Sequence, residues 1–166
     1  MLQIFVNLAV EKQGAEPFAL SLEPQDVPVV HLPGAKIRVL LGSFADGHSP
    51  LSLPTEVRLL DISLDDNVSL LVPIPEGQST FVMPIFGTTV IEGQAFDANN
   101  PRLPVFLAQT TSREISLRAT DGNAKVIVFS GTPLRQPVHW QGPLALASAD
   151  ALADRMTAYQ RGEFGT

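Results

Sequence analysis

Cysteine is absent from this 166-residue chain, and basic side chains, histidines and long apolar runs are scarce. Without thiols, neither a disulfide framework nor a thiolate metal site can form. The 11 basic residues are outnumbered by 17 acidic ones, and the net charge of -6 repels the phosphates of nucleic acids. No apolar segment approaches the roughly 20 residues that span a bilayer. We therefore expect no nucleic-acid partner and no membrane insertion.

The first residues, MLQIFVNLAVEKQ, contain neither the basic stretch nor the small-residue cleavage site of a secretory signal. A cytoplasmic location is therefore the expectation. One domain is the default at this length, because a chain of about 150 residues buries roughly 70% of its unfolded surface.

Short apolar segments, cut by 14 prolines and 12 glycines, make up most of the sequence. Many short strands with turn signals between them are typical of a β-sandwich or barrel. Hairpin turns are predicted at LDDNV, EGQ, FGTT and TDGNA, because Asp, Asn and Gly tolerate a positive φ or bond their own backbone. The sequence therefore predicts an all-β fold.

Alternation within residues 57–64 separates the two faces of one predicted strand. The more apolar set is Arg58, Leu60, Ile62 and Leu64. Since side chains of a strand alternate between faces, this set is the better core face. By the same rule, Ile115 and Leu117 share one face of a later strand.

The segment SADALADRMTAYQRGEFG departs from the strand pattern. Ser148 can cap a helix, and Gly162 can close it in a left-handed conformation. The apolar positions on one helical face are Leu152, Met156 and Tyr159. A C-terminal helix over 148–161 is therefore predicted.

Histidines are the only candidates for nitrogen ligands to a metal, and the three of them fall in different segments. Metal sites usually draw two ligands from one element, so an exposed or hydrogen-bonded imidazole is favoured for each. The alternative is a dispersed metal site of His31, His139 and Glu76. No nucleophile elbow and no phosphate-binding loop is present, so no catalytic residue is assigned.

The stretch GTPLRQPVHWQGP, residues 131–143, raises the question of whether His139 and Trp140 form a working site. The favoured interpretation is structural. Pro133 and Pro137 stiffen an extended path. Trp140 offers a side chain that can bury about 150–250 Å² and hold the following helix to the barrel. We therefore predict Pro133, Pro137 and Trp140 as structural anchors.

Together, the strand KVIVFSG, the exit GTPLRQPVHWQGP and the ending YQRGEFG resemble the C-terminal cupin domain of the pirin family. IFVNL and LLDISLDDNVSLLVPIPEGQSTFVMPIFG are similar to the family's linking strand and barrel core. The resemblance implies a cupin-type double-stranded β-helix, or jelly-roll barrel, with a C-terminal α-helix. The whole chain, 1–166, would form one such domain, with the barrel at about 1–130, a crossover at 131–147 and the helix at 148–161.

The family's fold holds iron in an N-terminal barrel through a His-x-His pair, a Glu and a later His. Here the corresponding segment is Pro73-Ile74-Pro75-Glu76-Gly77, and Ser79 takes the place of the Glu. The resemblance therefore carries neither the iron site nor a quercetin-cleaving dioxygenase activity to this chain. We expect no cofactor, with Fe or another divalent metal as the alternative.

The favoured function is a metal-free cupin module with a structural, protein-interaction or small-ligand-binding role. A small ligand inside the barrel and a homodimer that uses the N-terminal strand LQIFVNL are the expected partners. Two alternatives stay open. One is a metal-dependent, quercetinase-like dioxygenase, and the other is a split half of a two-barrel pirin.

Overall fold

The computed structural model describes residues 3–16, 18–99 and 102–163. The chain divides into two compact units. The sheet unit is Ser21–Pro133, and the terminal unit combines Met1–Leu20 with Leu134–Thr166. No helix in the described part of the chain has the length and apolar character that crossing a bilayer requires.

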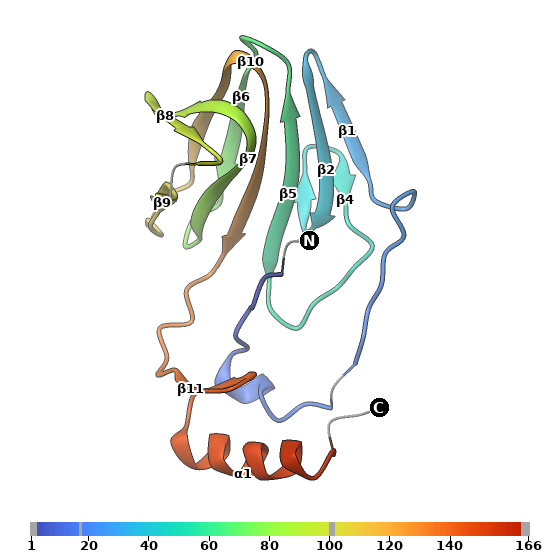
Figure 1. Ribbon diagram of the computed structural model, residues 1–166, viewed down its shortest axis with the longest axis vertical. Helices are drawn as coiled ribbons and strands as arrows, with labels where there is room; N and C mark the ends of the chain where they lie inside the picture. The colour runs from blue at the N-terminus through green and yellow to red at the C-terminus, as the bar shows by residue number, and fades with distance from the viewer. Residues whose placement is uncertain (1–2, 17, 100–101, 164–166) are drawn as a thin grey trace. The chain divides into compact units, whose positions relative to one another are not determined.

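The sheet unit is built from strands separated by short turns (Figure 1). Its strands are β1 (Val29–Leu32), β2 (Ala35–Leu41), β3 (Ser43–Phe44), β4 (Gly47–His48), β5 (Val57–Leu64), β6 (Ser69–Ile74), β7 (Ser79–Ile91), β8 (Gln94–Asp97), β9 (Val105–Phe106) and β10 (Arg113–Gly131). All pairings between them are antiparallel.

The main sheet follows the order β1-β2-β5-β10-β7-β8. β10 is the central strand, because its first half pairs with β6, its second half pairs with β5, and β7 runs along its other side. Figure 1 shows the length of β10 between these neighbours. β9 adds to β7, and β3 pairs only with β4.

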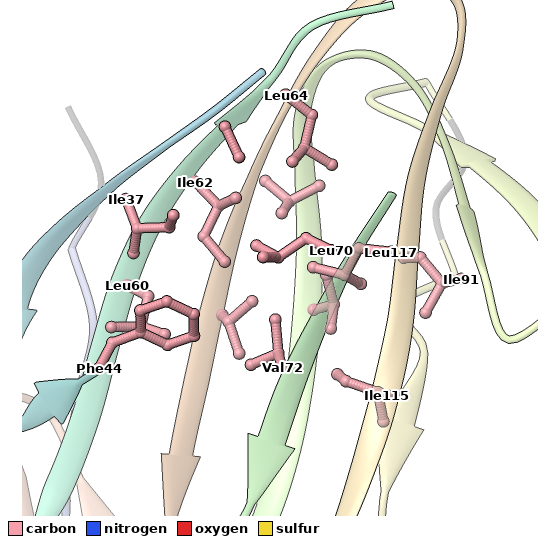
Figure 2. Packing of buried hydrophobic residues seen from close by; sticks show 14 of the residues in the cluster. Ile37, Phe44, Leu60, Ile62, Leu64, Leu70, Val72, Ile91, Ile115 and Leu117 are labelled. Atoms are coloured by element: carbon pink, nitrogen blue, oxygen red, sulfur yellow. The ribbon is translucent and has the colours of Figure 1, made fainter. Parts of the chain in front are cut away.

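One apolar cluster lies inside the curved sheet, and nearly all strands of the unit contribute to it. Figure 2 shows Ile37, Leu60 and Ile62 pointing toward Leu70 and Val72 across the core. The predicted core face of β5 is confirmed, since Leu60, Ile62 and Leu64 are at most 2% exposed. Ile115 and Leu117 are buried on one face of β10, also as predicted.

Two of the predicted hairpin turns are wrong. FGTT lies inside β7, and TDGNA lies inside β10, where the pairing of the two strands shifts register. Asp121 and Gly87 have positive φ angles, as turn residues do, yet here they accommodate a β-bulge. Gly87 has no room for a side chain, because a Cβ atom would overlap the carbonyl oxygen of Asn123.

The bulge in β10 is fixed by the turn after β5. The backbone N–H of Gly122 donates to Asp66 Oδ1 at 3.0 Å, and the N–H of Asp66 donates to Asn123 Oδ1 at 3.0 Å. β10 changes its partner from β6 to β5 at this point. LDDNV therefore forms the turn that the sequence predicts, and that turn also contacts a strand more than fifty residues away.

The terminal unit contains a short 3₁₀ helix, η1 (Val10–Lys12), the hairpin of β11 (His139–Gln141) and β12 (Leu144–Leu146), and the helix α1 (Ala149–Gln160). The predicted helix is confirmed with its caps. Ser148 Oγ accepts the N–H of Ala151, and Gly162 has a φ of 74°. Leu152 is the buried residue of the helix.

The N-terminal strand expected at LQIFVNL does not form in the described residues, because residues 3–9 have no strand partner. Side-chain amides hold this segment instead. Gln136 accepts the N–H of Val10 and donates to the carbonyl of Leu8, while Gln13 Oε1 accepts the N–H of Ala147. The barrel expected from about residue 1 therefore has its first strand at Val29.

Candidate ligand-binding site

A row of polar side chains lies at one end of the apolar core. Arg58 near the start of β5, Ser130 near the end of β10 and Thr80 near the start of β7 occupy adjacent register positions. All three are buried, with exposed fractions of 8%, 0% and 1%. Because side chains alternate along a strand, Arg58 faces the same side as Leu60 and therefore faces inward. We call Arg58, Thr80, Ser130 and Gln78 the polar end.

Hydrogen bonds connect this row. Arg58 Nη2 donates to Ser130 Oγ at 3.2 Å and to the carbonyl oxygen of Pro73 on β6. Ser130 Oγ and Thr80 Oγ1 are 2.8 Å apart, and either hydroxyl can be the donor. Gln78, two residues before Thr80, is also buried. The polar end thus links β5, β6, β7 and β10.

Arg58 is buried without a counter-ion. Among the described residues, no carboxylate lies within ion-pair distance of it, and its Nε has no hydrogen-bond partner. Burial lowers the pKa of the Arg58 guanidinium, because desolvation penalises the charged form. The side chain nevertheless stays protonated near neutral pH, since guanidinium ionisation lies far above that range. The polar end is therefore a buried positive charge.

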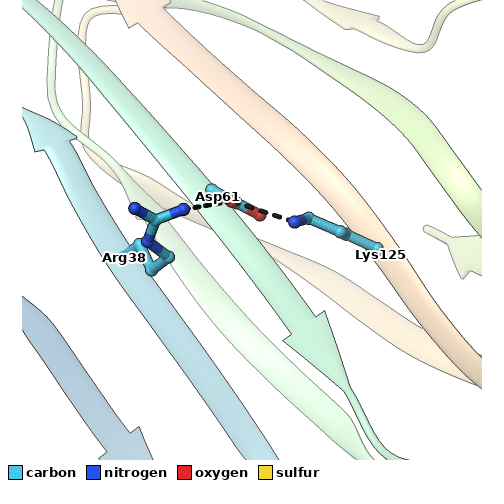
Figure 3. A network of polar contacts seen from close by, with 3 residues as sticks. All are labelled: Arg38, Asp61 and Lys125. Carbon is cyan, nitrogen blue, oxygen red and sulfur yellow. Dashed lines mark ion pairs between the residues drawn. The ribbon is translucent and has the colours of Figure 1, made fainter. Parts of the chain in front are cut away.

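The nearest acidic residue along β5, Asp61, lies on the opposite face of the strand and has partners of its own. Its carboxylate is 3.0 Å from Lys125 Nζ and 3.5 Å from Arg38 Nη1 (Figure 3). The sequence pattern places Asp61 outside the core, and it does face away from Leu60. It is nevertheless only 6% exposed. Register across three strands creates this ion-pair cluster, and no local sequence pattern indicates it.

The residues of the alternative metal site lie on separate elements. His31 is exposed on β1, Glu76 is exposed in the turn between β6 and β7, and His139 is exposed on β11 of the terminal unit. In the described ranges, no group of three His, Cys, Asp or Glu side chains is arranged to hold a metal ion. Ser79, in the place of the family's Glu, accepts a hydrogen bond from the N–H of Ala108.

The polar end also does not fit a divalent metal. Such ions bind imidazole, thiolate or carboxylate groups, whereas this end of the core supplies a guanidinium, an amide and two hydroxyls. The charge of Arg58 would repel a cation placed beside it. An anion or a neutral polar group suits these donors better.

The predicted anchors lie in or just before the terminal unit. Pro133 is half-buried and Pro137 is exposed. Trp140 is 58% exposed, and its role as an anchor stays a prediction. Its indole N–H donates to the carbonyl of Gly142 at 2.9 Å, and its ring lies 5.4 Å from that of Phe5. For His139, the described residues supply no side-chain hydrogen bond.

Gln13 and Gln136 hold the terminal unit together instead, and sequence reasoning missed both. Each makes hydrogen bonds to backbone groups of distant segments. Glutamine is common on protein surfaces, so neither residue carries a signal that could have identified this role from the sequence.

Comparison with known families decides what kind of domain this is. The sequence model of the pirin C-terminal cupin domain matches residues 59–165, more than half of the chain. The chain belongs to the pirin C-terminal cupin domain family. This confirms the resemblance seen in the sequence.

Curated relatives of this pirin-family chain extend well beyond it. Human pirin is 24% identical over 165 residues, and a Pseudomonas aeruginosa protein provisionally named quercetin 2,3-dioxygenase is 27% identical over 172 residues. These alignments cover 99% and 96% of the pirin-family chain but only 57% of each relative. The chain thus spans little more than half the length of the curated relatives it matches.

A solved structure supports the fold of the pirin-family domain. The crystal structure of quercetin 2,3-dioxygenase from Acinetobacter baumannii matches it with a TM-score of 0.85 and 24% identity. The match covers 97% of this chain and 55% of that chain. The predicted all-β cupin fold with a C-terminal helix is therefore confirmed.

Proposed function

We propose that this cupin domain binds a small molecule at the polar end of its core and performs no metal chemistry of its own. The observation that carries the proposal is the buried Arg58, which has hydrogen-bond partners but no counter-ion among the described residues. Buried unpaired charges are expensive to maintain and are concentrated at functional sites. A negatively charged or polar ligand that pairs with Arg58 would offset the cost of burying this charge.

The neighbouring side chains support the same proposal. Gln78 Oε1 and Arg58 Nε are both buried, and neither has a hydrogen-bond partner in the part of the chain that the structure describes. Unsatisfied buried polar atoms are rare in folded proteins and call for a specific explanation, of which a bound ligand is one. The apolar core behind them offers a rigid support, because its side chains come from nearly every strand of the sheet unit.

The proposal is tested by pairing metal analysis with ligand screening. The protein, purified without added metal, is analysed by elemental mass spectrometry and then screened by thermal shift against small organic acids, sugars and neutral aromatic compounds. We expect metal well below one ion per chain and a raised Tm with at least one compound class. Near-stoichiometric Fe, Ni, Mn or Zn that is lost in His139→Ala would contradict the proposal.

A second candidate function follows from the printed names of relatives. Two similar proteins carry the name quercetin 2,3-dioxygenase. We infer that, if this chain shares that activity, either the dispersed His31, His139 and Glu76 or a partner barrel on another chain would have to bind the metal. Oxygen consumption with quercetin after anaerobic loading with Fe(II) tests this candidate, and His139→Ala is the matched variant.

We still propose a homodimer for the assembly, but residues 3–8 of the expected interface strand LQIFVNL form no strand in the structure. Exposed apolar side chains gather on β9 and the adjoining residues, where Val105 and Leu107 are 61% and 73% exposed. Exposed apolar patches often mark sites of association. Light scattering at working concentration should give twice the chain mass, and a monomer would contradict the dimer without touching the ligand-binding proposal.

A further inference from the structure

Resting on the proposed function, we infer that the polar end recognises one carboxylate group of a small organic anion. Arg58 is the residue that would pair with it, and the hydroxyls of Thr80 and Ser130 would complete the contact. The inference rests on which hydrogen-bonding groups at the polar end remain unused.

Arg58 has donors to spare. A guanidinium carries five N–H donors. Nη2 is used by Pro73 and Ser130, Nε is buried without a partner, and Nη1 makes no hydrogen bond within the described residues. If Arg58 served only to connect β5 to β6, the bonds of Nη2 would be sufficient. The unused Nε and Nη1 donors match an acceptor that brings its own negative charge.

The hydroxyl pair also leaves one donor unused. Ser130 Oγ accepts a hydrogen bond from Arg58 Nη2, and Ser130 and Thr80 share a single hydrogen bond with each other. Two hydroxyls carry two protons, and only one lies in that shared bond. Whichever hydroxyl donates, the proton of the other one remains available to an oxygen of the ligand. The polar end also has one buried acceptor without a partner among the described residues, Gln78 Oε1. Its unused donors therefore outnumber its unused acceptors, and they lie beside a positive charge.

A single carboxylate fits this arrangement better than a phosphate. One buried guanidinium neutralises one negative charge, whereas phosphate sites in proteins gather several cations or backbone N–H groups. Lys125 and Arg38 do not add to the positive charge of the polar end, because both pair with Asp61 on the other face of β5. A ligand that enters this end of the core would therefore present one carboxylate.

The test uses acetate as the probe, with chloride at matched ionic strength and pH as the reference. In isotope-labelled protein, the Arg58 Nε–Hε resonance is identified by its loss in Arg58→Lys. We expect acetate to shift this resonance saturably and to raise Tm, with no such effect of chloride. Arg155→Met, which removes an exposed arginine of α1, should leave acetate binding unchanged.

The variants set the size of the effect. A charge-assisted hydrogen bond contributes enough that Arg58→Met should weaken acetate binding about 10- to 100-fold, and Thr80→Val should weaken it less. If the chemical shift of the Arg58 Nε–Hε resonance does not change with acetate, the inference is overturned, even if Arg58→Met fails to fold. So would an Arg58→Met protein that binds acetate as tightly as the parent.

The two proposals can fail separately. If neutral compounds raise Tm and acetate does not, carboxylate recognition is wrong and the ligand-binding function stands. If no compound binds and the protein retains stoichiometric metal, the proposed function is wrong as well.

Discussion

Replacing Asp61 by Asn should destabilise the protein, because Asp61 carries the only negative charge in its ion-pair cluster (Figure 3). The carboxylate is nearly buried, while the side chains of Arg38 and Lys125 are 33% and 38% exposed. Solvent therefore screens both pairs, and partly exposed pairs contribute about 0.2–1 kcal/mol each. Losing two pairs while two cations stay close together should lower the free energy of unfolding by about 1–2 kcal/mol.

Urea denaturation followed by circular dichroism measures this loss at low and at high salt. The difference between Asp61→Asn and the parent should shrink as salt is added, because screening already weakens the pairs in the parent. Asp46→Asn removes the same charge from an exposed turn and should lie within about 0.5 kcal/mol of the parent. The reasoning is refuted if Asp61→Asn is as stable as Asp46→Asn at low salt.

Three further substitutions probe the fold, each by urea denaturation. Gly87→Ala should lower the free energy of unfolding by about 1–3 kcal/mol more than Gly77→Ala does. Both glycines have a positive φ, but only at Gly87 would the new Cβ overlap a backbone oxygen. Equal losses in the two variants would contradict the bulge geometry. Leu60→Ala leaves a cavity in the core and should lower the free energy of unfolding by about 2–5 kcal/mol. Leu71→Ala, at an exposed position, should lower it much less. Ser148→Ala should lose about 1 kcal/mol with the helix cap, and no loss would mean that the cap is not made.

Local sequence patterns predicted elements whose signals lie within one segment. The alternation in 57–64 gave the buried face of β5, and the caps Ser148 and Gly162 gave the ends of α1. In each case the physical cause is local, since strand alternation and helix capping depend on residues within about one turn or a few positions.

Turn chemistry gave correct and incorrect predictions for the same reason. Asp, Asn and Gly allow positive φ angles, and a hairpin and a β-bulge both require them. TDGNA and FGTT meet that requirement inside two paired strands, where the bulge of β10 lies opposite Gly87. Only the pairing between β7 and β10 distinguishes the two outcomes, and that pairing joins residues far apart in the sequence.

The candidate site depends on register in the same way. The sequence pattern placed Arg58 on the core face, but its partner Ser130 lies 72 positions away. Thr80 reaches Ser130 only because β7 and β5 flank β10 at matching positions. Trp140 is mostly exposed, although large apolar side chains are usually buried, and its role as an anchor stays a prediction.

A crystal structure of the protein soaked in acetate tests the central claim most directly. The account predicts a planar carboxylate beside Arg58, with an oxygen within hydrogen-bond distance of Nε and a second contact to Thr80 or Ser130. A transition-metal ion with protein ligands at the same end of the core would contradict it, and so would an Arg58 guanidinium that contacts protein atoms alone at saturating acetate.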